Sequence, residues 1–174
     1  MKIMFARAQG ERLARELGGE KPPINVEQIA RKLGLRVAGA KLGAGVSGLL
    51  VTNDEEKCIC VQAADSAERK RFTIAHEIGH FQLRHQFAEG THVHVDHGHL
   101  ISQRSTRSSQ GIDPIEVEAN QFAACLLMPS NLLRTEVLQI DGPLRDGDVE
   151  RLASKFKVSE QAMTIRLSTL RLLG

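Results

Sequence analysis

The chain has 174 residues, of which 41% are hydrophobic and 25% are charged, and its formal net charge is +2. This composition fits a globular protein with one sizeable core and excludes both a disordered chain and a strongly basic nucleic-acid binder. No apolar run approaches the roughly 20 residues that span a bilayer, and the N-terminus lacks a secretory signal, so we expect a cytoplasmic protein without membrane contact.

The spacing of apolar residues and the positions of turn-forming residues predict, in chain order, helices at 3–17 and 25–34, strands at 35–38, 47–52 and 57–62, a helix at 66–86, a strand at 91–96, and helices at 114–128 and 130–140. Ser130 is expected to cap the helix that it opens. Two short helices, opened by Asp148 and Ser159, close the chain. Strands at 47–52 and 57–62 are expected to form a hairpin. The pattern predicts an α+β fold, with helices around a small antiparallel sheet.

The segment RFTIAHEIGH contains an HExxH motif formed by His76, Glu77 and His80. Positions i and i+4 of a helix project from one face, so that the two imidazoles can bind one metal ion. Glu77 lies about 100° around the helix from His76, beside the metal, where it can act as a general base. Gly79 indicates the close approach of a neighbouring strand or of substrate. Chance alone gives HExxH in about 2% of shuffled sequences, so two packed or solvated histidines remain an alternative.

The segment EVEANQFAACLLMP offers the third protein ligand that a zinc peptidase needs. Glu116 begins a helix whose adjacent face carries alanines and Asn120, and these small residues let the helix approach the histidine helix. The alternative is that Glu116 and Glu118 are ordinary acidic residues of a first turn, which the helix dipole favours. His85, at the end of the histidine helix, is interpreted as a surface histidine.

Together, RFTIAHEIGH and ExEANxFAAxLLMP resemble the ImmA/IrrE family of metallopeptidases, and the segment INVEQIARKLGL and the hairpin are also similar to that family. The resemblance covers roughly residues 20–130. It implies zincin-like helices packed on the small antiparallel-type sheet, a metallopeptidase domain at 1–130, and a C-terminal helical subdomain at 131–174 packed on it.

The resemblance also implies a gluzincin-like site. Its metal ligands would be His76, His80 and Glu116, not Glu118, and Glu77 would be the catalytic base. Asn120 would contact a metal-binding histidine and fix the orientation of its ring. The expected cofactor is Zn²⁺, with another divalent ion such as Mn²⁺ as the alternative.

Many such enzymes add a Tyr, His or Arg that stabilises the oxyanion. This sequence has no tyrosine, so the candidates for oxyanion or substrate contact lie between the two motifs: His94, His97, Arg104 and Arg107. The four histidines within 92–99 alternatively belong to a surface strand or form a second metal site. Three cysteines, at 58, 60 and 125, lack zinc-site spacing and are expected to be buried, reduced thiols.

Residues 150–167 resemble a helix-turn-helix in which Lys157 replaces the usual turn glycine. With a net charge of only +2, we favour a packing role over DNA binding, although basic residues there could contact phosphates. The family resemblance implies a protein substrate, namely a helix-turn-helix repressor, and hence a regulatory endopeptidase for stress, phage or mobile-element genes. We expect the substrate to pair with the hairpin's edge strand at 47–52. The alternatives are a non-catalytic regulator that binds a repressor or toxin, and a DNA-binding protein.

Overall fold

The computed structural model describes residues 2–53, 56–85, 93–96 and 113–173. These residues form seven helices and four strands: α1 (Lys2–Leu17), α2 (Val26–Lys32), β1 (Arg36–Ala40), β2 (Gly48–Thr52), β3 (Lys57–Gln62), α3 (Ala67–Leu83), β4 (Val93–Asp96), α4 (Pro114–Leu127), α5 (Ser130–Val137), α6 (Asp146–Phe156) and α7 (Glu160–Thr169). The α+β prediction is confirmed. None of the described helices combines the length and the apolar character that a bilayer crossing needs.

The four strands form one sheet in the order β1-β3-β2-β4. β2 is antiparallel to β3, as the predicted hairpin requires, and it is also antiparallel to β4. β1 runs parallel to β3, which makes the sheet mixed. Because β4 covers the outer side of β2, residues 47–52 are not an edge strand, and the expected site of substrate pairing there is wrong. Among the described strands, β4 and β1 are the outer ones.

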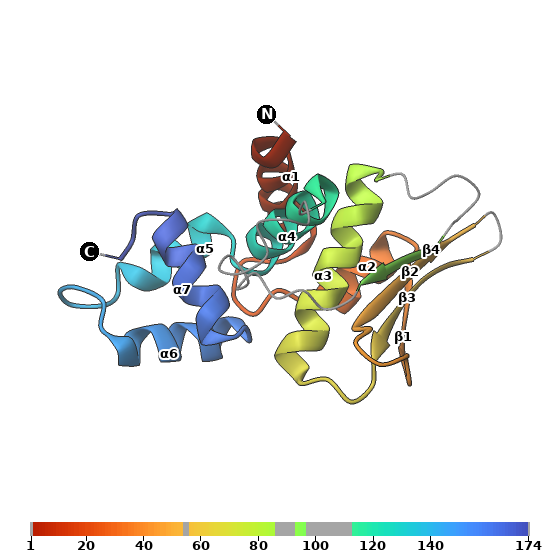
Figure 1. Cartoon of the computed structure of the whole chain (residues 1–174). Helices are drawn as coiled ribbons and strands as arrows, with labels where there is room; N and C mark the ends of the chain where they lie inside the picture. Colours follow the sequence, from red (N-terminus) through yellow and green to blue (C-terminus); the bar gives the residue numbers. More distant parts are fainter. Residues whose placement is uncertain (1, 54–55, 86–92, 97–112, 174) are drawn as a thin grey trace.

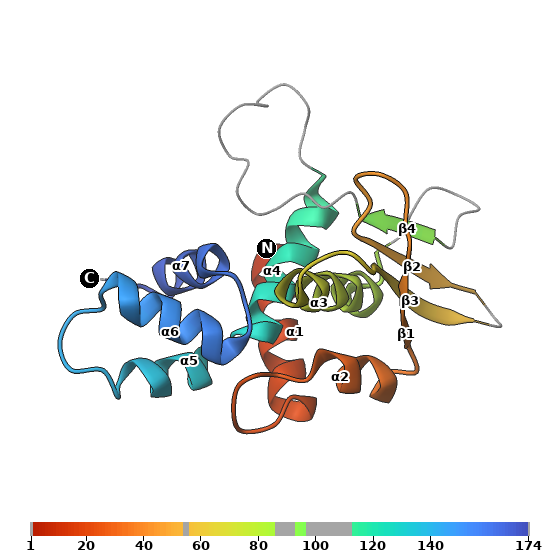
Figure 2. The ribbon, with the colours of Figure 1, turned by 90° about the horizontal axis from the view of Figure 1, so that it is seen from below.

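The helix α3 lies between the sheet and the helices α1, α4, α5, α6 and α7, whereas α2 lies beside the sheet and contacts β1 (Figure 1). The helix α3 contacts β2 and β3 on one side and α4 on the other, and α1 packs against α4. Seen from below in Figure 2, the sheet lies to one side of α3, while α5, α6 and α7 lie together on the opposite side. Phe122, Leu126 and Ile78 are fully buried at this centre.

Gly79 lets α3 and α4 approach closely. A Cβ atom at this position would lie 3.1 Å from Phe122 Cδ1 and 3.3 Å from the Ala119 Cα. The neighbour of Gly79 is therefore a helix, and the strand or substrate expected from the sequence is not what approaches it. The alanine face of α4 allows this contact, as predicted.

Several helix ends differ from the sequence prediction, among them the end of α5 at Val137 in place of 140. α3 ends at Leu83 because Arg84 adopts the left-handed conformation, with φ of 53°. α5 is preceded by Pro129 as its N-cap, and its first amide, that of Ser130, donates to the Glu11 carboxylate at 3.0 and 3.1 Å. A side chain from α1 thus caps this helix, in place of Ser130. α6 begins at Asp146, before the expected Asp148.

Candidate metal centre

Three side chains from two helices converge between α3 and α4. The Nε2 atoms of His76 and His80 lie 2.9 Å apart. The two carboxylate oxygens of Glu116 lie 3.3 Å from the Nε2 atom of His76 and 3.4 Å from that of His80. All three residues could hold one metal ion, and they are the three that the sequence prediction named. Both imidazoles are buried, whereas the side chain of Glu116 is 32% exposed, so the cluster is accessible from one side.

Local sequence explains this convergence. The histidines are four residues apart on α3 and therefore share a face. Glu116 lies in the first turn of α4, where Pro114 is also placed, and Asp113 caps this turn by accepting from the Ile115 amide at 3.0 Å. The close contact of α3 and α4 at Gly79 brings the two helices' polar groups together.

Asn120 contacts the ring of His76 at Nδ1, the nitrogen that does not face the cluster. Its Oδ1 atom lies 2.9 Å from Nδ1 of His76. Because an amide oxygen only accepts, Nδ1 of His76 donates, and the lone pair on Nε2 faces the cluster. The contact expected for Asn120 is therefore present, and its influence on metal binding stays a prediction.

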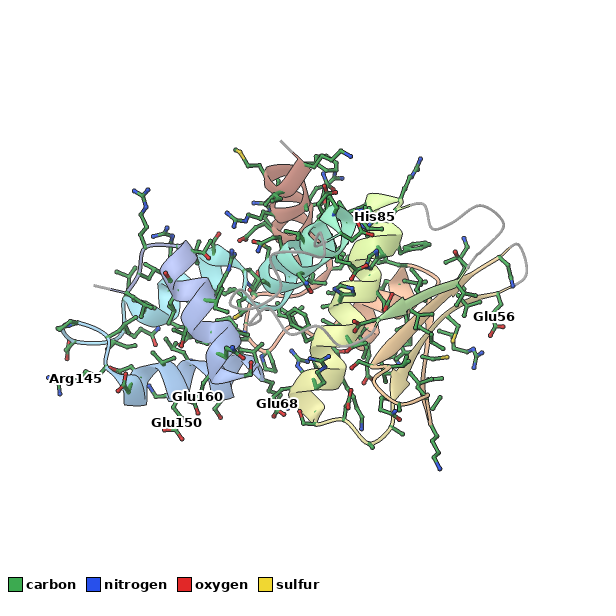
Figure 3. The ribbon with its side chains drawn as sticks, in the orientation of Figure 1. Glu56, Glu68, His85, Arg145, Glu150 and Glu160 are labelled. Atoms are coloured by element: carbon green, nitrogen blue, oxygen red, sulfur yellow. The ribbon has the colours of Figure 1, made fainter. Side chains whose placement is uncertain are left out.

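His80 is held by two residues that the sequence prediction did not assign to the site. Its Nδ1 atom lies 2.9 Å from Nδ1 of His85, whose Nε2 atom lies 3.3 Å from the Glu118 carboxylate. The carboxylate accepts from His85, His85 then accepts from His80, and the Nε2 lone pair of His80 also faces the cluster. The His85 side chain is 6% exposed, so its interpretation as a surface histidine is wrong. Figure 3 shows it at the end of α3.

The turn at Arg84 explains why His85 was missed. A continued helix would place His85 about 140° around the axis from His80. The left-handed Arg84 instead ends the helix, and the His85 amide donates to the His80 carbonyl at 3.1 Å. The sequence signal that could have pointed to the pair is the second acidic residue of the ExE pattern, Glu118, which the structure shows to be buried and paired with His85.

The donor set fits a bound cation. Two imidazole lone pairs 2.9 Å apart, beside a carboxylate, repel one another unless a proton or a metal ion lies among them. A tetrahedral zinc ion with bonds of about 2.0–2.1 Å holds its ligand atoms about 3.3 Å apart. The two distances to Glu116 match that spacing, and the histidine pair would separate by a few tenths of an ångström.

The electrostatic surroundings favour positive charge at this point. Burial lowers the pKa of His76, but the hydrogen bond to Glu116 and the charges of Glu77 and Asp96 outweigh burial, and the pKa is raised overall. Asp96, the last residue of β4, is buried, and the sequence prediction did not include it. Burial lowers the pKa of His85, which keeps that ring neutral, as its role as an acceptor from His80 requires.

Glu77 is fully buried beside the metal cluster. The β2 backbone passes directly over it: a Cβ atom at Gly48 would lie 3.2 Å from Oε1 of Glu77 and 2.3 Å from Cγ2 of Thr73. Only glycine allows this approach without a shift. Glu77 is not one of the three clustered ligands, which agrees with its expected position beside the metal.

The expected oxyanion or substrate contacts stay predictions. His94 belongs to β4, but its side chain lies outside the described residues, as do all of His97, Arg104 and Arg107. The cysteines are free thiols, as expected. Cys58 and Cys125 are buried, whereas Cys60, expected to be buried, is half-buried, and its sulfur atom lies 3.7 Å from that of Cys58.

The comparisons with known proteins agree with this site. The model of the M78 peptidase family, described as an IrrE N-terminal-like domain, matches residues 30–168, so the chain belongs to this family of metallopeptidases. A search of curated proteins found no match. Among solved structures, a Mycobacterium tuberculosis transcriptional regulator is similar, with a TM-score of 0.61 and 19% identity. The match covers 100% of this chain and 54% of that protein, so this chain spans about half of its length. At this identity, the likeness concerns the fold.

Proposed function

We propose that this protein is a zinc-dependent regulatory endopeptidase that cleaves a specific helix-turn-helix transcriptional repressor. The observation that carries the proposal is the convergence of His76, His80 and Glu116 with the buried Glu77 beside them. Membership of a metallopeptidase family supports hydrolysis. The link to transcription comes from the family resemblance and from the name of the structural relative, and it concerns the substrate only.

In this mechanism a zinc ion, when bound, supplies a Lewis acid that polarises the peptide carbonyl and acidifies the attacking water. Glu77 accepts the proton of that water and delivers it to the departing amine. Burial of Glu77 excludes bulk water and strengthens its interaction with the reacting groups. Asn120 and His85 keep the imidazoles turned toward the ion.

The substrate chain is expected to lie along β4, the outer strand beside β2. Val93 and Val95 of β4 are 42% and 38% exposed, so one face of this outer strand offers apolar side chains to a bound chain. An extended peptide can add to such an edge through backbone hydrogen bonds. This location replaces the 47–52 strand expected from the sequence.

The central test compares the wild type with Glu77→Gln at equal zinc content. Gln is nearly isosteric with Glu but cannot accept the proton, so we expect unchanged folding and metal content and a loss of about 10²–10⁴-fold in cleavage rate. Candidate substrates are helix-turn-helix repressors encoded near the gene of this protein, and products are followed by gel and mass spectrometry. A variant that cuts as fast as the wild type would remove Glu77 from the mechanism.

The same experiment separates the alternatives. If both proteins release the repressor from DNA without cutting it, the protein is a non-catalytic regulator. A salt-dependent gel shift with this protein alone would indicate DNA binding through the C-terminal helices. Casein serves as a specificity control: rapid digestion of casein at low enzyme concentration would contradict a restricted, regulatory protease.

A further inference from the structure

A cavity of about 580 Å³ lies where the first turns of α3 face α6 and α7. Its apolar lining comes from both parts of the chain: Phe72, Ala153, Val158, Ala162 and Ile165. Phe72, Ala162 and Ile165 are only partly buried, so apolar side chains are open to solvent at this point. We call this cavity the α3–α6–α7 groove.

The charged lining of the groove is mainly acidic. Glu68, Glu150 and Glu160 come from three different helices, and Figure 3 shows them along the same edge of the molecule. Within the described part of the chain, no salt bridge involves any of the three. The basic residue of the lining, Arg69, donates to Ser47 Oγ at 2.9 Å.

Helix dipoles explain only part of this charge. Glu68 and Glu160 lie in the first turns of α3 and α7, where a negative side chain is favoured. Glu150 lies beyond the first turn of α6, so the dipole of that helix does not stabilise its charge in the same way. Three carboxylates around an open apolar surface are complementary to a ligand that combines apolar side chains with positive charge.

The groove and the metal site share α3. Glu68 and Phe72 of the lining precede His76 by about two turns and one turn, and each step of four residues also turns about 40° around the helix axis. Along the helix axis, Phe72 lies about 9 Å from the midpoint of the two histidines, at 1.5 Å per residue. About three extended residues span that distance. The offset around the helix lengthens this path, so a substrate chain of several extended residues is needed to reach both places.

We propose that the α3–α6–α7 groove is an exosite that binds a basic amphipathic segment of the protein substrate, a few residues from the bond that is cut. Apolar residues of the segment contact Phe72, Ala162 and Ile165, and its lysines or arginines face the three glutamates. This inference rests on the proposed function, because it identifies the ligand as the substrate. It adds a second recognition site, which gives a small protease selectivity beyond its cleft.

The first test measures direct binding with the zinc-loaded Glu77→Gln protein. The probe is a fluorescent synthetic amphipathic helix with a leucine stripe flanked by lysines, and the control peptide has glutamates in place of the lysines. We expect the lysine peptide to bind, with an affinity that falls with salt, and the glutamate peptide not to bind. Equal binding of both peptides would overturn the proposal.

The matched variants are Glu150→Lys with Glu160→Lys, and the exposed Glu20→Lys as a control for total charge. Because two attractive contacts become repulsive, the double variant should lose about tenfold in affinity for the lysine peptide. Glu20→Lys should change affinity by less than about twofold. Thermal unfolding and zinc content confirm that each variant is folded. Unchanged affinity in the double variant would show that the groove is not the binding site.

The second test uses cleavage of the repressor by the catalytically competent protein. Groove variants should raise KM while leaving kcat near the wild-type value, because the groove contacts substrate away from the reacting bond. An unchanged KM would contradict the exosite. If the wild type does not cleave the repressor, the proposed function fails, and the peptide titration with its variants still decides whether the groove binds a basic segment.

Discussion

His76 and His80 each depend on a different partner for the orientation of their rings. Asn120 on α4 holds His76, whereas His80 is held through His85 and then Glu118. Helical spacing brings the two imidazoles to one face, but it does not fix the rotation of either ring. The outer hydrogen bonds do so, because each one makes Nδ1 the donor and leaves Nε2 as the acceptor for a cation.

We predict that His85→Ala lowers zinc affinity by about 10–100-fold while the protein stays folded. The ring of His80 would then lose the acceptor that fixes its tautomer. Competition with a fluorescent zinc chelator measures the affinity. His85→Asn should restore part of it, because the amide oxygen can accept from His80. Gln82→Ala, at the same end of α3, is the matched control and should leave affinity unchanged.

The two acidic residues of the ExE pattern should differ in the same assay. Glu116→Ala removes a ligand and should empty the site, whereas Glu118→Ala removes only the partner of His85 and should cause a loss comparable to that of His85→Ala. A variant series in which Glu118→Ala empties the site and Glu116→Ala leaves it filled would reverse the assignment.

The raised pKa of His76 predicts opposite pH dependences for the metal-free and zinc-loaded proteins. A raised folded-state pKa contributes stability that is present below the unfolded value of about 6.5 and is lost as pH rises through the folded pKa. The metal-free protein should therefore lose stability as pH rises from 6.5 through that pKa. Zinc must displace this proton, so zinc binding should strengthen over the same range.

Thermal unfolding of both forms at several pH values checks this prediction. His76→Asn, which has no proton to lose in this range, should remove the loss of stability in the metal-free form. A metal-free wild type that becomes more stable than His76→Asn as pH rises would contradict the assigned pKa direction.

Much of the candidate metal cluster was predictable because HExxH is local: two of the three clustered side chains and the proposed base lie within five consecutive residues on one helix. Glu116 was predictable from the small residues beside it together with the family resemblance. His85 and Asp96 were not, because one follows a left-handed turn and the other ends a strand whose position depends on long-range pairing.

At the scale of elements, sequence periodicity predicted the helices and strands but not how the strands are arranged. The hairpin of β2 and β3 follows from one short turn. The pairing of β4 with β2, and of β1 with β3, joins segments that are distant in sequence, and no local pattern encodes either pairing. The cap of α5 illustrates the same limit, because Glu11 lies on α1.

Gly48 positions β2 against α3, and we predict that Gly48→Ala destabilises the protein by about 1–3 kcal/mol and lowers activity. The added methyl would overlap Cγ2 of Thr73 and push the strand away from Glu77. Gly39→Ala on β1 is the matched control, because a Cβ atom there meets nothing within 4 Å. Urea unfolding and cleavage rates give the two measurements.

A second substitution tests whether contact with Thr73 causes the loss of stability in Gly48→Ala. Thr73→Ser removes the methyl that the added Cβ atom would meet, so Gly48→Ala combined with Thr73→Ser should recover part of the lost stability. If Gly48→Ala is as stable as Gly39→Ala, the strand has room to move, and the close approach does not position Glu77.

At the scale of the whole molecule, two arginines connect the C-terminal helices to the rest. Arg166 of α7 is buried, pairs with Glu11 of α1, and donates to the Met128 carbonyl at 3.0 Å. Arg71 of α3 donates to carbonyls of Ile24 and of the end of α6. Arg71 thereby connects α3, which carries His76 and His80, to the end of α6, whereas Arg166 connects α7 to α1. The proposed exosite lies between α3, α6 and α7.

We predict that Arg71→Ala destabilises the protein by about 2–4 kcal/mol. A hydrogen bond from a charged donor contributes about 1.5–3 kcal/mol, the bonds of one partly exposed guanidinium do not add in full, and their loss leaves partly buried acceptors unpaired. Its guanidinium donates to the Ile24 carbonyl at 2.9 Å, the Lys157 carbonyl at 3.1 Å and the Phe156 carbonyl at 3.4 Å. A positive charge at the C-terminal end of α6 also interacts favourably with the dipole of that helix. Urea unfolding measures the loss.

Hydrogen exchange shows which elements lose stability in Arg71→Ala. Amides of α6 and α7 should exchange faster in Arg71→Ala than in the wild type, while the zinc affinity of the folded protein should change little, because Arg71 does not contact the metal cluster. Arg71→Lys keeps the charge but presents a single point donor. The amide exchange rates of this variant should therefore lie between those of Arg71→Ala and the wild type. Arg151→Ala, which removes only an exposed pair with Asp148, is the control and should cost less than about 1 kcal/mol. If Arg71→Ala leaves the exchange of α6 and α7 unchanged, these helices are held to α3 by apolar packing alone, and the geometry of the groove does not depend on this arginine.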